Sequence, residues 1–359
     1  MQTESMVLSE PGAFRREAYS LPDMDEGALL EVEMTSVCGS DIGIYRGKSP
    51  FASFPLILGH EVAGRIVDGA TDTLDQWGLD IGDRVMPEPY IPCNACLECH
   101  RGHYHMCEKG RAYGVTISAE EAPHLWGGYG QYMYLDPHSR LHQIGDHVSA
   151  RAACLGSVIG NGVRWVVTKG QVAPGDSVAI IGPGAQGLAS TIVAAEAGAD
   201  PILAVGLESD RAKLALSEEF GATETLNADD NDAAERGLAF NDGAGFDIVV
   251  VAAPSRAATQ LGIDLVRPRG RVVLVGLTGD EMAVNMDRVV MDEITLLGGR
   301  GQSTNVERAM TILERNVDAV ERINSHVFSV SDAAIAIERQ LPGEQFDPDI
   351  IHAALSPDA

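Results

Sequence analysis

The sequence predicts an α/β protein of two domains, one rich in short β-strands and one built on a doubly wound parallel sheet. Three observations support this fold class. A chain of 359 residues is too long for one ordinary hydrophobic core. Its first part carries short β-branched runs separated by Gly and Pro. From about residue 170, apolar runs alternate with helical patterns, as in a parallel sheet covered by helices.

The elements follow from these patterns. In the first part, strands are expected at 29–37, 62–67 and 83–87. In the second part, strands are expected at 177–182, 202–206, 246–253 and 271–277. The last of these runs, RVVLVGL, is expected to end the parallel sheet, and the acidic stretch 227–237 is expected to be a solvated loop. After about residue 295 the pattern is mainly helical.

Charge and hydropathy exclude several classes of partner. The net charge is −26, which repels nucleic acid and anionic membranes. No apolar run approaches the roughly 18 residues of a membrane span, and the N-terminus lacks the pattern of a secretory signal. We therefore expect a cytoplasmic protein whose thiols are reduced. Its acid-rich, lysine-poor composition also suits high salt, which screens self-repulsion.

The segment CNACLECHRGHYHMC (93–107) carries the strongest chemical signal. Its cysteines follow the spacing C-x2-C-x2-C-x7-C, and four thiolates can close a tetrahedral shell around zinc. A closed shell leaves no position for a substrate, so this zinc is expected to be structural. The predicted ligands are Cys93, Cys96, Cys99 and Cys107.

A second signal, SVAIIGPGAQGLAS (177–190), places G-x-G-x-x-G between a predicted strand and a predicted helix. In this context the glycines allow a tight turn and close approach of a pyrophosphate to the helix N-terminus. The expected dinucleotide-binding residues of this loop are Gly182, Gly184, Ala185, Gln186 and Gly187.

The end of the next predicted strand bears on the choice of nucleotide. That strand ends in Gly206 rather than in an acid that would bind a ribose 2′-hydroxyl. Arg211 follows closely and favours a 2′-phosphate, hence NADP. Glu208 argues for NAD, because it can serve a 2′-hydroxyl from a shifted position. We favour NADP and keep NAD as the alternative.

The third signal is split between two short segments. VCGSDIGIYRG (37–47) contains Cys38, and LILGHEVAG (56–64) contains His60 and Glu61. Five further segments follow in a fixed order and spacing: GDRV, the four-cysteine lobe, GGYGQY, GPGAQG and RPRGRVVLVG. Together with the two segments above, they resemble those of the zinc-containing medium-chain dehydrogenases/reductases. This family is the group of alcohol, sorbitol and threonine dehydrogenases. The resemblance covers nearly the whole chain.

The resemblance implies a domain organisation and an assembly. A GroES-like β-rich catalytic domain would comprise residues 1–152 and 296–359, and a Rossmann dinucleotide-binding domain would comprise residues 153–295. Family members commonly form homodimers or homotetramers, and we expect a homo-oligomer that acts on a small-molecule substrate.

The resemblance also implies a catalytic zinc, with Cys38 and His60 as ligands and Glu61 beside the metal. Ser40 would accept the proton of an alcohol, and Asp41 would orient nearby groups. Many members have a histidine five positions after the cysteine that passes this proton to solvent. This chain has Gly43 there, so that relay is missing and the proton would leave through water or the cofactor ribose.

The third zinc ligand of the family falls near Ser157, and neither Ser157 nor its neighbours Gly156 and Val158 suit zinc. Cys154 lies three residues earlier and would share a helix face with that position. Two alternatives follow: Cys154 is the third ligand, or it is a small buried core residue. In the second case the shell is Cys38, His60 and Glu61 with water.

These residues support three hypotheses. The leading one is a zinc-dependent oxidoreductase, an alcohol dehydrogenase that transfers hydride between an alcohol, polyol or sugar and NAD(P) and holds one structural and one catalytic zinc. The second is an NADPH-dependent reductase with only the structural zinc. The third is a non-catalytic nucleotide-binding protein. The sequence does not identify the substrate.

Overall fold

The computed structural model describes residues 2–279 and 281–358. The chain divides into two compact units, one of Met1–Ser157 with Leu313–Ala359 and one of Val158–Ile312. The first unit is thus made from both ends of the chain. The unit boundaries lie at 157/158 and 312/313, whereas the sequence placed the domain boundaries at 152/153 and 295/296.

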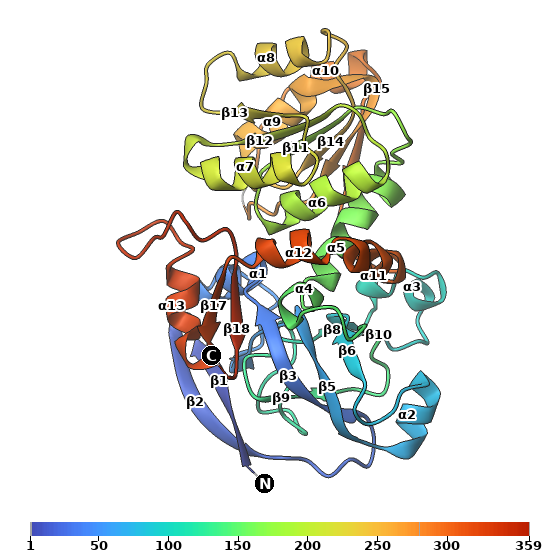
Figure 1. Cartoon of the computed structure of the whole chain (residues 1–359), viewed down its shortest axis with the longest axis vertical. Helices are drawn as coiled ribbons and strands as arrows, with labels where there is room; N and C mark the ends of the chain where they lie inside the picture. Colours follow the sequence, from blue (N-terminus) through green and yellow to red (C-terminus); the bar gives the residue numbers. More distant parts are fainter. Residues whose placement is uncertain (1, 280, 359) are drawn as a thin grey trace. The chain divides into compact units, whose positions relative to one another are not determined.

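The first unit is rich in β-structure (Figure 1). One sheet has the order β2-β1-β4, and a larger sheet has the order β10-β6-β5-β3-β18-β17, with β9 also paired to β3. A two-stranded sheet joins β7 and β8. The strands are β1 (Gln2–Glu10), β2 (Ala13–Ser20), β3 (Ala28–Ser36), β4 (Leu56–Ile57), β5 (Val62–Gly69), β6 (Arg84–Pro87), β7 (Tyr90–Ile91), β8 (Arg111–Ala112), β9 (Tyr132–Leu135), β10 (Leu141–Gln143), β17 (His326–Ser329) and β18 (Ala353–Ser356).

The larger sheet joins distant parts of the chain. β18, at the C-terminal end, pairs antiparallel with β3, so that Ala354 lies opposite Ser36. Apolar side chains such as Leu30, Ile66 and Tyr129 are fully buried and form one core in this unit. Because β3 is paired on both sides, the chain that leaves it at Ser36 has a fixed position. The residues that follow are those of the Cys38 segment.

Short helices connect these strands. They are α1 (Gly39–Tyr45), α2 (Thr71–Trp77), α3 (Leu97–His100), α4 (Ala150–Ala153), α12 (Val317–Ile323) and α13 (Ala333–Glu338). Two further helices, α5 (Gly156–Gly162) and α11 (Val306–Arg315), span the unit boundaries, and α5 continues as a π-helix over Val163–Lys169. Within residues 2–279 and 281–358, no helix is both long and apolar enough to cross a bilayer.

The second unit contains a six-stranded sheet whose strands are all parallel, in the order β13-β12-β11-β14-β15-β16. This is the strand order 3-2-1-4-5-6 of a Rossmann sheet, and the predicted fold class is confirmed. β11 and β12 are buried along their whole length, as expected of strands covered on both faces. The strands are β11 (Val178–Ile181), β12 (Ile202–Gly206), β13 (Glu224–Asn227), β14 (Phe246–Val251), β15 (Val266–Leu274) and β16 (Thr295–Gly298).

Helices flank this sheet (Figure 1). α6 packs on β11 and β12, and α7 packs on β12 and β13. α8 packs on β13, α9 packs on β11, β14 and β15, and these two helices also contact each other. The helices are α6 (Ala185–Glu196), α7 (Arg211–Glu219), α8 (Ala233–Phe240), α9 (Arg256–Leu265) and α10 (Met286–Met291).

Two local expectations for this unit are wrong. The run RVVLVGL does not end the sheet, because β16 pairs parallel with β15 beyond it. The acidic stretch 227–237 is not a loop throughout, because α8 begins at Ala233. In α8 the buried Ala233 and Gly237 are one turn apart and face the core, while its one acidic residue, Glu235, is exposed.

Candidate active site and metal sites

The Cys38 segment is positioned by the end of β3 and the start of α1. Cys38 is the N-cap of α1, and its backbone N–H donates to Asp41 Oδ2 at 3.0 Å. This bond returns the fully buried Asp41 side chain to the helix start, where an acid suits the helix dipole. Ser40 lies on the exposed side of the same turn. One turn of helix thus presents a thiol, a hydroxyl and a buried carboxylate.

The His60 segment lies between β4 and β5, and its turn depends on Gly59. Gly59 has φ +92°, and a Cβ there would lie 2.6 Å from the Tyr129 ring. The Glu61 carbonyl accepts from Ser36 N–H at 2.9 Å, which fixes this turn against the end of β3. The two segments predicted from sequence are therefore adjacent in the fold.

The contacts of the His60 ring assign different roles to its two nitrogens. Nδ1 lies 3.3 Å from Asp41 Oδ1, and Nε2 lies 3.2 Å from Ser40 Oγ. Asp41 is in turn held by the Tyr129 hydroxyl, which donates to Oδ2 at 3.3 Å. A carboxylate at one nitrogen orients the ring and leaves the other nitrogen available to a metal.

Ligand atoms of Cys38, His60 and Glu61 all lie within 4.8 Å of one another. A thiol, an imidazole and a carboxylate are the side chains that bind zinc. The Glu61 side chain is 3% exposed, and a carboxylate buried beside a thiol and an imidazole is stabilised by a bound cation. This donor set therefore fits a zinc ion.

The charges around this group favour a cation. Burial lowers the pKa of His60, but the charges of Asp41 and Cys38 outweigh burial and hold it well above the ordinary imidazole value. Burial raises the pKa of the Cys38 thiol, and the Glu61 carboxylate raises it further. Negative groups thus surround the ring, and a positive charge placed here is stabilised.

Cys154 lies outside this group of three. Its Sγ is 3.2 Å from Ser36 Oγ and 3.3 Å from Asn324 Nδ2, and both partners are fully buried. Burial raises the pKa of the Cys154 thiol to about 12. The hydroxyl of Ser157, near the family's usual third-ligand position, donates to Met86 Sδ at 3.5 Å.

The four-cysteine lobe brings its thiols together as the spacing predicts. Ligand atoms of Cys93, Cys96, Cys99 and Cys107 all lie within 4.8 Å of one another. Backbone N–H groups of Glu108 and Cys99 lower the pKa of Cys96 to about 6, so this thiol ionises readily. Four sulfur donors in one short loop fit a closed zinc shell.

The glycine-rich loop connects β11 to α6. Gly182 has φ +99°, and Gly184 is the N-cap of α6. A Cβ on Gly187 would lie 2.0 Å from the Gly182 carbonyl oxygen, so only glycine allows this close packing. A Cβ on Gly184 would meet nothing within 4 Å, which leaves space beside the helix N-terminus. This loop fits the pyrophosphate of a dinucleotide.

The rest of the loop and the end of β12 complete this region. Ala185 is buried at the start of α6, and Gln186 accepts from Asn161 Nδ2 at 3.2 Å. Gly206 is buried at the end of β12. Beyond it, Arg211 pairs with Glu208, and their side chains are 79% and 54% exposed. Both are thus accessible to a nucleotide.

The sequence did not predict two residues that contact the Cys38 group and its supporting Asp41, or the residue that contacts Cys154. His352 Nε2 lies 3.7 Å from Glu61 Oε2, Tyr129 holds Asp41, and Asn324 holds Cys154. His352 and Asn324 come from the last part of the chain, and no local pattern marks either of them. Only the pairing of β18 with β3 brings His352 to the site.

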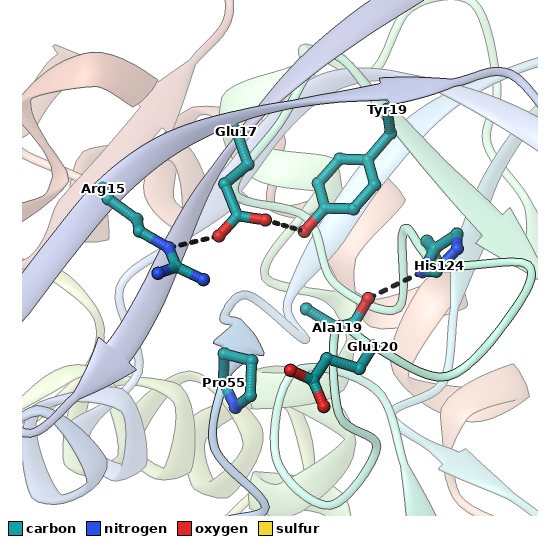
Figure 2. A pocket seen from close by; sticks show the side chains of 7 residues that line it. All are labelled: Arg15, Glu17, Tyr19, Pro55, Ala119, Glu120 and His124. Carbon is teal, nitrogen blue, oxygen red and sulfur yellow. Dashed lines mark hydrogen bonds and ion pairs between the residues drawn. The ribbon is translucent and has the colours of Figure 1, made fainter.

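A surface pocket of about 290 Å³ lies elsewhere in the first unit (Figure 2). Along β2, Arg15 pairs with Glu17, and Tyr19 donates to Glu17 at 2.8 Å. His124 and Glu120 lie on the facing segment. None of its lining residues belongs to either cysteine-containing group.

Comparisons with known proteins agree with this geometry. Residues 24–146 match the alcohol dehydrogenase GroES-like domain, and residues 185–315 match the zinc-binding dehydrogenase domain. The chain is 36% identical over 316 residues to a probable alcohol dehydrogenase of Mycobacterium tuberculosis, covering 85% of each chain. It is 30% identical over 338 residues to the sorbitol dehydrogenase of Halalkalibacterium halodurans, covering 92% of this chain and 93% of that one.

A solved structure agrees in fold. An alcohol dehydrogenase from Thermotoga maritima matches with a TM-score of 0.87 at 23% identity, covering 99% of each chain. At this identity the likeness concerns the fold, whereas the family rests on the domain matches and the sequence relatives. The chain belongs to the zinc-containing medium-chain dehydrogenases/reductases, oxidoreductases that use zinc and a nicotinamide cofactor.

Proposed function

We propose that this enzyme interconverts a secondary alcohol or polyol and its carbonyl at a zinc held by Cys38, His60 and Glu61. The observation that carries the proposal is the meeting of these three ligand atoms within 4.8 Å. The sorbitol dehydrogenase relative supports a polyol as the substrate class. The exposed Ser40 hydroxyl beside this group leaves the site accessible to a small molecule.

In this proposal the chain's own residues hold the ligands and move the proton. When bound, zinc acts as a Lewis acid that lowers the pKa of the substrate hydroxyl. Asp41 orients His60, and Ser40 accepts the substrate proton, because its hydroxyl is exposed and lies against the His60 ring. Since position 43 is glycine, the proton leaves Ser40 through water or the cofactor ribose rather than through an imidazole there.

We assign the third protein ligand to Glu61 rather than to Cys154. The Cys154 thiol already has two buried polar partners, Ser36 and Asn324, and it lies outside the group of three ligand atoms. Glu61, in contrast, places a carboxylate oxygen within 4.8 Å of the ligand atoms of Cys38 and His60. Cys154 is then a core residue, and water completes the zinc shell.

The second zinc is structural and is held by the four-cysteine lobe. Its four ligands leave no open position, so this metal stabilises the loop between β7 and β8 and takes no part in the reaction. The proposed content of the enzyme is therefore two zinc ions per chain.

We further propose NADP as the preferred nucleotide. β12 ends in Gly206, and the exposed Arg211 guanidinium can bind a 2′-phosphate once it leaves Glu208. Arg211→Gln is expected to raise KM for NADP about tenfold and leave KM for NAD unchanged, since one exposed charge-assisted contact is lost. An equal effect on both nucleotides would contradict this role of Arg211.

Exposed apolar side chains between β15 and β16 support a homo-oligomer. In this connection α10 presents Val290 and Met291 with 73% and 80% of their surface exposed, and Leu277 is 90% exposed. Three such side chains within one connection of the chain support an interface between subunits there. Light scattering coupled to size exclusion should give a mass of two or four chains, and a 38.1 kDa monomer would contradict the proposal.

Steady-state kinetics test the proposed reaction. We expect nicotinamide-linked oxidation of at least one member of a panel of secondary alcohols and polyols, and its loss in Cys38→Ala. Cys154→Ala is the matched control, because it removes a thiol of the same unit that the proposal places outside the zinc shell. Equal activity of Cys38→Ala and the wild type would overturn the assignment of the site.

A further inference from the structure

The buried Glu61 carboxylate has one oxygen that lacks a hydrogen-bond donor. Glu61 is 3% exposed, and its Oε2 atom has no hydrogen-bond partner within the described residues. Leaving a buried acceptor unsatisfied costs about 1–3 kcal/mol, and more for a charged group. A metal ion bound by one oxygen of this carboxylate still leaves the other oxygen to be accounted for.

His352 faces that oxygen. Its Nε2 lies 3.7 Å from Glu61 Oε2, and this nitrogen is also buried without a hydrogen-bond partner. His352 is 7% exposed, so solvent does not compete effectively for the imidazole. The two unsatisfied atoms thus lie opposite each other, at ion-pair distance.

The backbone holds His352 in this position. The next residue, Ala353, begins β18 and accepts from Val37 N–H at 2.9 Å, directly before Cys38. The His352 carbonyl accepts from Ser325 Oγ at 3.4 Å and from His326 N–H at 3.4 Å. The imidazole is therefore attached to the same sheet that carries the Cys38 segment.

We propose that His352 is a positioning residue for the catalytic zinc: its Nε2–H donates to Glu61 Oε2 and so orients the carboxylate with its other oxygen toward the metal. This inference rests on the proposed role of Glu61 as a zinc ligand. Asp41 orients His60 in the same way, so each of these two adjacent ligands has its own buried partner. Partners of this kind typically contribute 10- to 100-fold to metal affinity.

Two substitutions test the hydrogen-bond donor of His352 separately from the volume of its side chain. His352→Leu removes the donor and is expected to weaken zinc binding at the catalytic site about 10- to 100-fold. His352→Gln retains an amide N–H, and its zinc affinity is expected to lie between those of His352→Leu and the wild type. His326→Gln is the matched control, because His326 lies on the neighbouring strand β17 and its ring Nδ1 contacts Ser325 Oγ instead of a proposed zinc ligand.

The readouts are zinc affinity by chelator competition, the visible spectrum of the cobalt-substituted enzyme and the melting temperature of the metal-free protein. We expect His352→Leu to change the zinc affinity and the cobalt spectrum. Its melting temperature without metal should stay close to that of His326→Gln. The cobalt spectrum reports the ligands of the metal, which a merely structural role of His352 would not alter.

The outcomes distinguish this inference from the proposed function. If the wild type holds two zinc ions and His352→Leu binds both as tightly as the wild type, the inference is wrong and the function stands. If His352→Leu lowers only the melting temperature, His352 is structural and the inference is also wrong. If the wild type holds only one zinc ion, both the inference and the proposed function are wrong.

Discussion

At the residue scale, the site depends on which polar groups are already satisfied. Cys154 and Glu61 are both buried in the same unit, yet they differ in their partners. The Cys154 thiol contacts Ser36 and Asn324, whereas Glu61 Oε2 makes no hydrogen bond within the described residues and lies 3.7 Å from His352 Nε2. On the proposed assignment, a cysteine near the expected ligand position is not sufficient to predict a ligand.

The first prediction concerns Cys154→Ser. We expect the variant to retain the wild-type zinc content, because serine keeps a polar group for Ser36 and Asn324 and the proposed zinc shell does not include this position. The expected loss of stability is about 1 kcal/mol, the size of one altered hydrogen bond. Elemental analysis and thermal unfolding measure the two quantities. Loss of one zinc per chain would instead identify Cys154 as the third ligand.

At the scale of elements, the turn between β11 and α6 separates two functions of glycine. Gly187 is required by packing, since its Cβ would lie 2.0 Å from the Gly182 carbonyl oxygen. Gly184 is not required by packing, since its Cβ would meet nothing within 4 Å. The space at Gly184 is instead available to a ligand at the N-terminus of α6.

These two glycines give the second prediction. Gly184→Ala should leave the melting temperature nearly unchanged and raise the dissociation constant for the nucleotide, because the new methyl group occupies the space for the pyrophosphate. Gly187→Ala should lower both the melting temperature and the affinity. Calorimetric titration and thermal unfolding measure the pair. Equal stability losses in the two variants would contradict this division.

The third prediction concerns Asp247, which joins three segments of the Rossmann unit. Its Oδ2 accepts from Ser177 N–H at 2.8 Å and Ser177 Oγ at 2.7 Å, and its Oδ1 accepts from Arg267 Nε at 2.7 Å. Burial raises the pKa of Asp247, but these donors outweigh burial and lower it overall. With the half-exposed guanidinium screened by solvent, we expect Asp247→Asn to cost about 1–2 kcal/mol at neutral pH.

The pH dependence of that loss follows from the direction of the shift. A lowered folded-state pKa stabilises the protein above the unfolded-state pKa of about 3.9, and the contribution disappears as pH falls through the folded value. The difference in unfolding free energy between the wild type and Asp247→Asn should therefore be largest near pH 7 and become smaller below about pH 4. Denaturant titrations at several pH values measure it. A difference that grows on acidification would contradict this account.

Sequence patterns predicted some elements well and others poorly, for physical reasons. The buried runs of β11 and β12 are continuous and apolar, so both strands were predictable. β16 is short and only partly buried, and α8 follows a run of acids and buries only small residues, so neither has a strong pattern. Likewise, Cys38 and His60 lie in recognisable segments, whereas His352 reaches Glu61 only through the β18–β3 pairing.

At the scale of the whole molecule, charge is the dominant feature. The chain has 52 acidic and 26 basic residues, with a net charge of −26. Self-repulsion of such a surface destabilises the compact state, and salt reduces it. The range of electrostatic interaction falls from about 10 Å at 0.1 M to about 3 Å at 1 M ionic strength.

The fourth prediction follows from this charge. The melting temperature should rise between about 0.1 M and 1 M KCl, because screening weakens the repulsion between carboxylates in the folded state. Potassium sulfate at equal ionic strength is the control, since screening alone predicts a similar rise, whereas exclusion of sulfate from the surface predicts a larger one. A melting temperature that is constant or falls with KCl would contradict the prediction.

The central claim is that the chain holds a catalytic zinc as well as a structural one. The most direct test is elemental mass spectrometry of zinc per chain, on tag-free protein purified without chelator. We expect a value near two, with one ion lost in Glu61→Ala and both retained in Cys154→Ser. A value near one that does not rise when zinc is added would leave only the four-cysteine site occupied and would contradict the account.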